Sequence, residues 1–266
     1  MTRHPLATPY PKPLIDYPAS DGQPMADNTL QFEWIVVLKE SLDLLFSDRP
    51  DVFVAGDLLW YPVEGNNKIR RAPDALVVFG RPKGYRGSYK QWAEEGIAPQ
   101  VVFEVLSPGN RLQEMAEKFE FYQTYGVEEY YLYDPETVEL SGWLRHAGQL
   151  QPIATMNQWR SPRLGIRFDF GAEQLVIHTP QGNTFLTFAE LDRRRQQAEV
   201  RATQAELIAR QVSEQLLTAE ARHQQDKQHL LALEAQAQAD RERAEVAEAK
   251  LRELEARLQR GNESPC

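Results

Sequence analysis

The chain has 266 residues, a formal net charge of −9 and a single cysteine, Cys266. One cysteine excludes an internal disulfide framework and a cysteine-based zinc site, and the net acidity disfavours a strongly basic nucleic-acid binder. The apolar runs are far shorter than the roughly 18 residues of a membrane span, and the proline-rich start shows no signal-peptide pattern. We therefore expect a cytoplasmic protein without membrane contact, long enough for one sizeable core.

The first part of the chain predicts an extended arm, a helix and several strands. Residues 1–25 are rich in proline and polar groups and read as the arm. A helix is predicted over 26–46, because Asp27 or Asn28 can cap it and apolar residues recur at helical spacing. Apolar segments then predict strands over 51–63 (with a break at Gly56), 72–80 and 100–106, with a polar connection between the last two.

The middle of the chain predicts a parallel crossover unit. Residues 111–126 read as a helix that Gly126 ends, and 127–134 read as the next strand. A strand, a helix and a strand in this order form a right-handed crossover with parallel strands. A hairpin around Ala147-Gly148 and two short strands within 165–180 follow. This order predicts an α/β domain whose mixed central sheet is flanked by helices.

The composition changes at about residue 189. Residues 189–260 contain no glycine or proline and consist mainly of good helix formers. Small and apolar residues recur in alternating steps of three and four, which is the pattern of a coiled coil. These residues form the seam, the stripe that would face a partner helix. The seam includes Leu216, Leu230 and Leu251, and its apolar pattern is weak at His223 and Asp226. A helix of this length extends on the order of 100 Å, so we predict a homo-oligomer formed through the coil.

Two acidic residues accompany the predicted strands. Asp74 precedes the apolar run of 72–80, and Glu104 lies inside the strand QVVFEVL. A buried carboxylate is costly unless it is paired or binds a metal. Two neighbouring strands that each carry a carboxylate can hold Mg²⁺, which would activate water and stabilise charge on a scissile phosphate. The alternative is that Asp74 caps a turn and Glu104 is a charge at a strand end.

Two segments resemble the Uma2 family (DUF820), which is bacterial, is abundant in cyanobacteria and has the restriction-endonuclease-like PD-(D/E)xK fold. The resemblance covers about residues 25–190 and lies in APDALVVFG and in QVVFEVLSPGNRLQEMAEKFEFYQTYGVEEYYLYDPE. The motifs are Pro-Asp before a strand, Glu-Val-x-Ser-Pro, a lysine and a tyrosine four apart on the next helix, and Gly-Val-x-Glu-Tyr. The resemblance implies a nuclease domain, and a C-terminal coiled coil is frequent in the family.

The resemblance also implies the site residues. Asp74 and Glu104 would be catalytic and would bind Mg²⁺ or Mn²⁺, with the backbone carbonyl of Val105 as a further metal ligand. In the wider nuclease fold a lysine lies two residues after the glutamate, but this chain has Leu106 there. The Uma2 pattern offers Lys118 on the following helix instead.

Lys118 is physically suited to that place. A lysine stem spans about 6 Å, so its ammonium can reach the sheet while its methylenes stay packed. The ammonium would orient or deprotonate the attacking water, or balance phosphate charge. The alternative is a surface lysine that pairs with Glu114 or Glu117.

Weaker candidates surround these three residues. Tyr122 shares a helix face with Lys118, and Asp57 would add a ligand or a hydrogen bond. Glu33 or Glu40 on the first helix would supply a second metal carboxylate, as first-helix acids do in some restriction nucleases. Phosphate contacts are expected from Arg111 and from the basic loop residues Arg81, Lys83, Arg86 and Lys90, and base stacking from Tyr85, Tyr89 and Trp92, although a solvated loop explains the loop residues equally well.

The sequence thus predicts four parts: an N-terminal arm (1–25), a Uma2-like nuclease domain (26–188), a coiled-coil helix (189–260) and a disordered tail (261–266). Three functions remain open. The first is a Mg²⁺-dependent endonuclease that cleaves DNA. The second is a catalytically weak or inactive scaffold that oligomerises through the coil. The third is a sugar hydrolase with Asp74 and Glu104 as an acid–base pair, which leaves Lys118 unexplained.

Overall fold

The computed structural model describes residues 15–20, 22, 24–110, 112–171 and 174–262. The chain divides into two compact units, Met1–Leu191 and Asp192–Cys266. The helical elements are α1 (Thr29–Leu45), η1 (Gln91–Glu94, a 3-10 helix), α2 (Leu112–Tyr125) and α3 (Phe188–Asn262). The strands are β1 (Val52–Ala55), β2 (Trp60–Tyr61), β3 (Ala75–Phe79), β4 (Tyr89–Lys90), β5 (Val101–Val105), β6 (Glu129–Asp134), β7 (Glu139–His146), β8 (Gln149–Pro152), β9 (Arg167–Phe170) and β10 (Leu175–His178).

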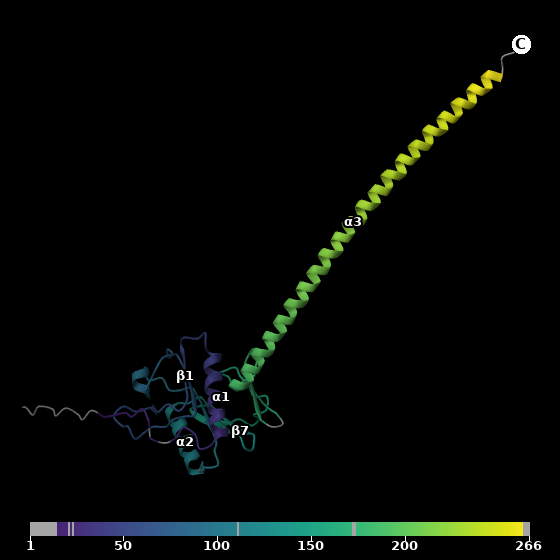
Figure 1. Ribbon diagram of the computed structural model, residues 1–266. Helices are drawn as coiled ribbons and strands as arrows, with labels where there is room; N and C mark the ends of the chain where they lie inside the picture. The colour runs from purple at the N-terminus through teal and green to yellow at the C-terminus, as the bar shows by residue number, and fades with distance from the viewer. Residues whose placement is uncertain (1–14, 21, 23, 111, 172–173, 263–266) are drawn as a thin grey trace, which may run out of the picture. The chain divides into compact units, whose positions relative to one another are not determined.

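A six-stranded mixed sheet forms the centre of the first unit, in the order β1-β3-β5-β6-β7-β8. β5 and β6 are parallel, and the other neighbours in this sheet are antiparallel. α2, which is labelled in Figure 1, makes the crossover between β5 and β6. The predicted α/β class with a mixed central sheet and the predicted parallel unit are both confirmed.

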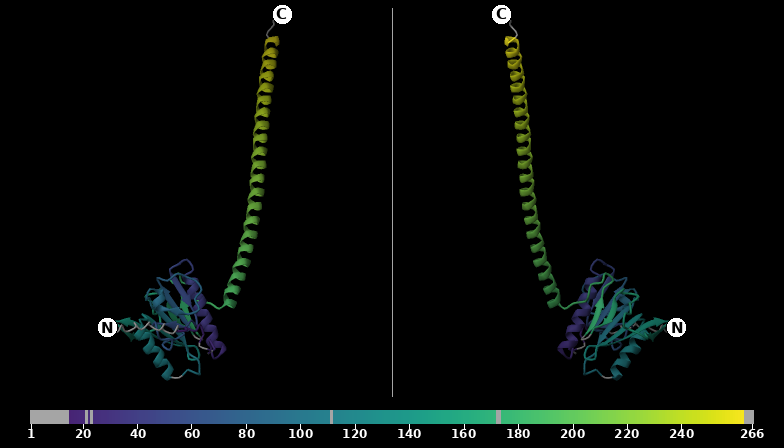
Figure 2. Two further views of the ribbon diagram at one scale, coloured as in Figure 1. Left: turned by 90° about the vertical axis from the view of Figure 1, so that its left-hand side faces the viewer. Right: turned by 90° about the vertical axis from the view of Figure 1, so that its right-hand side faces the viewer.

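The two faces of this sheet carry different layers (Figure 2). On one face, Ile35, Leu38 and Leu42 of α1 pack with the sheet and with the small β9–β10 sheet. On the other, Phe121 and Tyr122 of α2 pack with the sheet and with the parallel β2–β4 pair. Side chains along a strand point to alternate faces of the sheet. Odd-numbered and even-numbered positions of one strand therefore face different helices.

Local signals explain where the helices begin and end. The Asn28 side chain accepts a hydrogen bond from Gln31 N and caps α1, which selects one of the two predicted caps. Gly126 has φ +98°, a left-handed conformation that glycine adopts without strain, and it follows the last residue of α2. The predicted hairpin is confirmed, with Ala147 (φ +48°) and Gly148 (φ +86°) between β7 and β8.

Two connections differ from the sequence prediction. The predicted strand over 51–63 is divided into β1 and β2 by the segment 56–59, so the expected break at Gly56 is real but longer than one residue. The polar connection between β3 and β5 contains β4 and η1, which were not predicted. β4 has only two residues, too few for an alternating pattern to show in the sequence.

The described part of the predicted arm lies against β2, the loop between β2 and β3, and Trp92 of η1. Tyr17 contacts the rings of Tyr61 and Trp92, and its hydroxyl accepts a hydrogen bond from Gly65 N at 2.7 Å. Residues 1–14 of the arm lie outside the described residues. The described part of the arm therefore holds the loop between β2 and β3.

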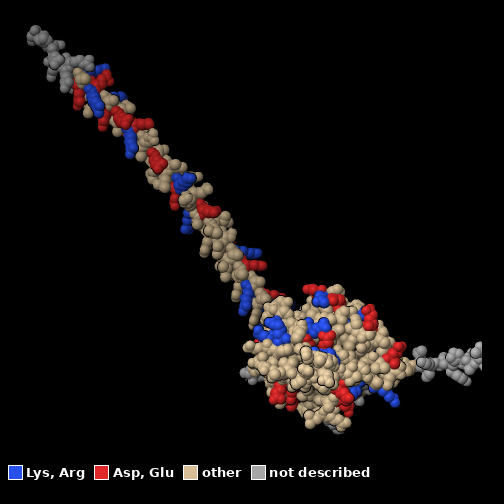
Figure 3. Space-filling view, turned by 180° about the vertical axis from the view of Figure 1, so that it is seen from behind, with Lys and Arg blue, Asp and Glu red and all other residues tan. Residues whose placement is uncertain are grey.

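Most of α3 belongs to the second unit, and its helix-forming composition predicts this helix. Thr187 and Glu190 exchange hydrogen bonds in a capping box at the start of this 75-residue helix. Acidic and basic side chains alternate along its surface (Figure 3), and Arg252–Glu248 is one of several pairs four residues apart. No helix in the described ranges is both long and apolar enough to cross a membrane. Residues 263–266 of the predicted tail lie outside the described residues.

Candidate active site

Strand parity places Asp74 and Glu104 on the same face of the sheet. Leu76 of β3 and Val102 of β5 pack on the α2 face, and Asp74 and Glu104 share their parity. The β3–β5 ladder ends at Ala75 and Phe103. One step further, both carboxylates point toward α2, where neighbouring strand ends come together.

Side chains complete the hydrogen bonding where the β3–β5 ladder stops. Asp74 Oδ2 accepts a hydrogen bond from Val105 N at 2.6 Å. Gln31 Nε2 of α1 donates one to the carbonyl oxygen of Val105 at 2.8 Å. The Gln31 amide is held in turn, because its Oε1 accepts a hydrogen bond from Asp27 N at 2.8 Å. The backbone at the end of β5 is therefore fixed from both sides.

Two side chains of α2 reach Glu104. Lys118 Nζ lies 2.8 Å from Glu104 Oε2, and the Tyr122 hydroxyl donates a short hydrogen bond to Glu104 Oε1. Lys118 and Tyr122 are one turn apart, so both face the sheet. Glu114, which the alternative reading paired with Lys118, is 4.0 Å from its Nζ. The structure thus brings Glu104, Lys118 and Tyr122 together beside Asp74.

The electrostatics of this cluster are those of two carboxylates that share one ammonium group. Asp74 is 8% exposed and Glu104 is 1% exposed. Burial, with the nearby Glu104 carboxylate, raises the pKa of Asp74 well above its ordinary value. Burial lowers the pKa of Lys118, but the carboxylates of Glu104 and Asp74 outweigh that effect and hold it above the ordinary value. Lys118 therefore stays protonated.

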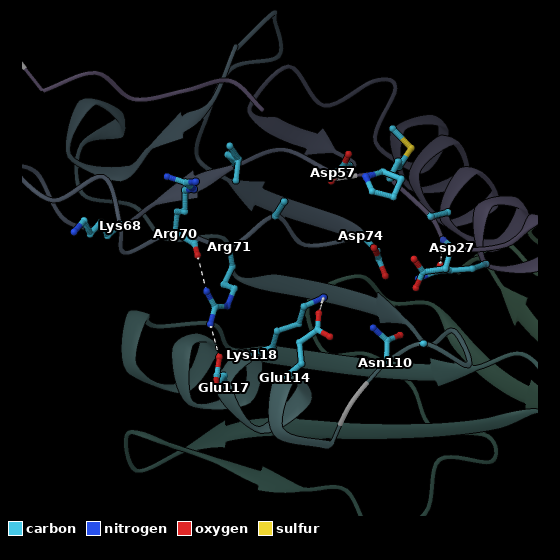
Figure 4. A pocket seen from close by; sticks show the side chains of 17 residues that line it. Asp27, Asp57, Lys68, Arg70, Arg71, Asp74, Asn110, Glu114, Glu117 and Lys118 are labelled. Atoms are coloured by element: carbon cyan, nitrogen blue, oxygen red, sulfur yellow. Dashed lines mark hydrogen bonds and ion pairs between the residues drawn. The ribbon is translucent and has the colours of Figure 1, made fainter. Parts of the chain in front are cut away.

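A cavity of about 790 Å³ opens over the cluster. Asp74 and Lys118 line it, with Asp27, Asn110 and Asp57 (Figure 4). Glu104 is buried and is not among the lining residues. A substrate in the cavity would therefore meet Asp74 and Lys118 directly and Glu104 through them.

The donor set suits a hard divalent cation. The carboxylates of Asp74 and Glu104 and the carbonyl of Val105 supply oxygen ligands, and each oxygen that already accepts a hydrogen bond keeps a second lone pair. Burial, and after it the nearby Glu104 carboxylate, disfavour the ionised form of Asp74 and raise its pKa, and a bound cation would offset both effects. No cluster of three or more His, Cys, Asp or Glu side chains placed to hold a metal occurs in the described part of the chain. The arrangement fits Mg²⁺, which commonly uses one or two protein carboxylates and water.

The Uma2 family model, described as "Putative restriction endonuclease", matches residues 26–173, more than half of the chain. The chain belongs to the Uma2 family. A solved structure that also matches is that of a "putative nuclease belonging to DUF820" from Anabaena variabilis, with 11% sequence identity and a TM-score of 0.40. The match covers 52% of this chain and 75% of that one, and a TM-score this low does not establish a common fold. Comparison with curated proteins found no match.

The expectation that Glu33 or Glu40 of the Uma2 domain adds a metal ligand is wrong. Both residues line a separate apolar groove beside Phe32 and Leu44, on another side of α1. Each helical residue advances by about 100°, so Glu33 and Glu40 lie roughly opposite Gln31. The side chain that α1 contributes to the site is the amide of Gln31.

The basic loop of the Uma2 domain is engaged within the protein, which favours the solvated-loop reading over phosphate contacts. Its four cations contact carboxylates or rings of the same chain: Arg81 with Glu94 and Glu95, Lys83 with Asp43, Arg86 with Glu94 and the Phe53 ring, and Lys90 with the Tyr17 ring. Tyr89 is buried and so is not available for stacking on a base, and the half-buried Trp92 packs against the ring of Tyr17. Tyr85 is 96% exposed, and Arg111 lies outside the described residues.

Sequence reasoning missed the cations that do line the cavity, which are Lys68, Arg70 and Arg71. They belong to the segment KIRRAPD, directly before Asp74. That adjacency was the available signal, because a chain segment leading into a site residue must pass close to the site.

A third buried carboxylate, Glu129, shows that burial alone does not mark a site. Glu129 accepts hydrogen bonds from Ser161 Oγ (2.5 Å), Tyr131 Oη (2.8 Å) and Arg163 N (2.6 Å). These donors satisfy both of its oxygens, and no second carboxylate contributes to its pKa shift. Glu129 links β6 to the segment before β9, and its role is structural.

Proposed function

We propose that this Uma2 protein is a Mg²⁺-dependent endonuclease that hydrolyses DNA phosphodiester bonds with an activated water. The observation that carries the proposal is the pair of buried carboxylates, Asp74 and Glu104, which share the single ammonium group of Lys118 beneath an open cavity. A site with this charge excess attracts a divalent cation and, through it, a phosphate group. The nuclease description of the family supports the same reading.

Each residue has a distinct role in this proposal. Asp74 and Glu104 hold the cation, and the Val105 carbonyl adds a ligand whose direction Gln31 fixes. The bound cation would supply Lewis-acid activation of water and charge stabilisation at the phosphate. Tyr122 orients Glu104 by donating a hydrogen bond to it.

Lys118 acts as a charge and hydrogen-bond donor rather than as a base. Its pKa lies above the ordinary lysine value, so it remains protonated at neutral pH. A protonated lysine can orient a water molecule or neutralise charge on a phosphate oxygen, but it cannot remove a proton. Of the roles that the sequence left open for Lys118, this excludes deprotonation of the attacking water.

The test is cleavage of plasmid DNA in Mg²⁺ or Mn²⁺ by the full chain and by Asp74→Asn and Glu104→Gln. We expect each substitution to lower the rate on the order of 100-fold or more, as the loss of an electrostatic catalytic group does. Glu33→Gln is the matched control, because Glu33 is an acidic residue outside the cavity. Folded wild-type protein that cleaves neither DNA nor RNA with either ion contradicts the proposal.

A second candidate is a scaffold without strong catalysis that assembles through α3. Leu216, Leu230 and Leu251 of its predicted seam are 59%, 60% and 59% exposed on the single helix, which favours a partner helix. Leu106 in place of the expected strand lysine is in line with weak catalysis. The sugar-hydrolase reading is disfavoured, because it gives no role to Lys118, whose ammonium group lies 2.8 Å from Glu104 Oε2.

A further inference from the structure

The cavity over the site has two ends of different charge. Asp27 and Asp74 lie at one end, and Lys68 and Arg70 lie at the other, where the connection between β2 and β3 forms its wall (Figure 4). In the view of Figure 4 Arg71 and Lys118 lie between them, and each has a further lining carboxylate beside it, Glu117 at 3.1 Å from Arg71 and Glu114 at 4.0 Å from Lys118. One end thus suits a cation and the other suits an anion.

Lys68 and Arg70 differ from most cations of this acidic domain. Residues 1–188 contain 17 basic and 24 acidic side chains, a net charge of −7. Most described basic side chains of this part pair with a carboxylate: Lys39, Arg49, Arg71, Arg81, Lys83, Arg86, Lys118, Arg163 and Arg167. Neither Lys68 nor Arg70 has a carboxylate partner among the described residues. Arg70 Nη1 donates to the carbonyl of Asn67 at 2.8 Å, and a guanidinium has further N–H donors to offer.

The loop that carries these two cations is held in place by the rest of the domain. Arg71 exchanges backbone hydrogen bonds with Trp60 at 2.8 and 3.2 Å. Asn67 Nδ2 donates to the carbonyl of Asp16 at 2.8 Å, and Gly65 N donates to the Tyr17 hydroxyl. A loop fixed in this way loses little conformational entropy when its cations bind an anion.

We propose that Lys68 and Arg70 bind backbone phosphates of a polynucleotide that crosses the cavity, beside the phosphate that lies at Asp74 and Lys118. This deepens the proposed nuclease function and rests on it. The binding is independent of base sequence, because no aromatic side chain is among the described residues that line the cavity, and backbone contacts carry no sequence information.

The experiment measures binding without cleavage. The full chain is titrated in EDTA against a fluorescein-labelled DNA duplex, and anisotropy gives the affinity at several salt concentrations. Lys68→Ala is compared with Lys90→Ala, and Arg70→Ala with Arg160→Ala. Neither control residue lines the cavity. Arg160 matches Arg70 because each guanidinium donates a hydrogen bond to a backbone carbonyl, Arg160 to Gly165 and Arg70 to Asn67. Thermal unfolding checks that all four variants are folded.

We expect Lys68→Ala and Arg70→Ala each to weaken binding about eightfold at 0.1 M salt and to lower the slope of log affinity against log salt by about 0.9, the value for one phosphate contact. The controls should bind like the wild type, and a duplex of scrambled sequence should bind equally well. Wild-type protein that does not bind the duplex at low salt, or variants that bind like their controls, would overturn the inference.

The outcomes separate this inference from the proposed function. In one outcome, cleavage depends on metal and on Asp74, but the affinity for DNA does not depend on Lys68 or Arg70. This outcome would contradict phosphate binding by Lys68 and Arg70 and would support the proposed nuclease function. In the other outcome, the affinity for DNA depends on Lys68 and Arg70, but the protein cleaves no nucleic acid. This outcome would contradict the proposed nuclease function and would support phosphate binding by these two residues.

Discussion

Lys118 Nζ lies 2.8 Å from Glu104 Oε2, although the first residue belongs to α2 and the second to β5, 14 positions apart. The usual nuclease pattern places its lysine on the same strand as the glutamate, where this chain has Leu106. The crossover helix thus supplies the ammonium group that the strand lacks. The pairing is possible because α2 packs on the face of the sheet toward which Glu104 points.

The first prediction concerns the stability of this ion pair. Lys118→Met leaves the Glu104 carboxylate buried without a cation, and we expect a loss of about 3 kcal/mol in the free energy of unfolding. The double variant Lys118→Met with Glu104→Gln should recover much of that loss, because the Glu104 charge that the ammonium group compensated is removed with it. Urea unfolding of the single and double variants measures the coupling.

Lys39→Met is the control for the ion pair. Lys39 pairs with Glu40 and Asp43 on the surface of α1, and surface pairs contribute about 1 kcal/mol or less. If Lys118→Met and Lys39→Met lower the free energy of unfolding by the same amount, the ion pair between Lys118 and Glu104 does not stabilise the domain more than a surface pair does.

The second prediction is a pH dependence of stability due to Asp74. Its pKa in the folded protein is raised, by burial and by Glu104, above that of the unfolded chain. Asp74 therefore contributes most to stability at a pH below the unfolded pKa, and this contribution is lost as pH rises through the folded pKa. We expect Asp74→Asn to be more stable than the wild type at neutral pH in EDTA, with the difference closing below about pH 4.

Urea unfolding at both pH values measures this difference, and Mg²⁺ should stabilise the wild type more than the variant. Asp51→Asn provides a control of opposite sign, because the hydrogen bond from Arg49 lowers the pKa of Asp51. That substitution should not stabilise the protein at neutral pH. An Asp74 variant that is less stable than the wild type at neutral pH would contradict the assigned direction of the shift.

The third prediction tests the contact between Gln31 and Val105. Gln31→Glu replaces the donor amide with a carboxylate, which cannot donate to the Val105 carbonyl at neutral pH and adds negative charge near Asp74. We expect a loss of about 2 kcal/mol, typical of a buried acceptor left without its partner. Thermal unfolding at neutral pH measures the loss, and acid pH should reduce it as the new carboxyl is protonated.

Glu33→Gln makes the reverse exchange on another side of α1, and it should change stability by about 0.5 kcal/mol or less. Equal stability of the two variants at neutral pH would show that Gln31 does not hold the end of β5.

The fourth prediction concerns assembly through α3. Leu216 and Leu230 lie on the predicted seam, whereas Leu217 and Leu231 are their exposed neighbours off the seam. We expect the full chain to be oligomeric and Leu216→Lys with Leu230→Lys to dissociate it, because lysine at core positions opposes coiled-coil pairing. Size-exclusion chromatography with light scattering gives the molar mass.

Leu217→Lys with Leu231→Lys is the matched control and should leave the molar mass unchanged. A wild-type chain that is monomeric at micromolar concentration, or equal behaviour of the two double variants, would show that the heptad pattern does not drive assembly.

Much of the fold could be read from the sequence, because the signals involved are local. The cap at Asn28, the stop at Gly126 and the Ala147-Gly148 turn depend on neighbouring residues, and all three are confirmed. The short strand β4 left no such signal, because its two residues pair with β2 through a distant contact.

The candidate site divides in the same way. The sequence by itself determined that Asp74 and Glu104 each accompany an apolar strand. The structure showed that these two strands are neighbours and that both carboxylates lie on one face of the sheet, because strand pairing depends on residues far apart in the chain. Only the tertiary structure decided which helix residues meet them, because that depends on the rotation and packing of α1 and α2. It brought Lys118 to Glu104, placed Gln31 rather than Glu33 at the end of β5, and left Lys68 and Arg70, not the basic loop of 81–90, on the cavity wall.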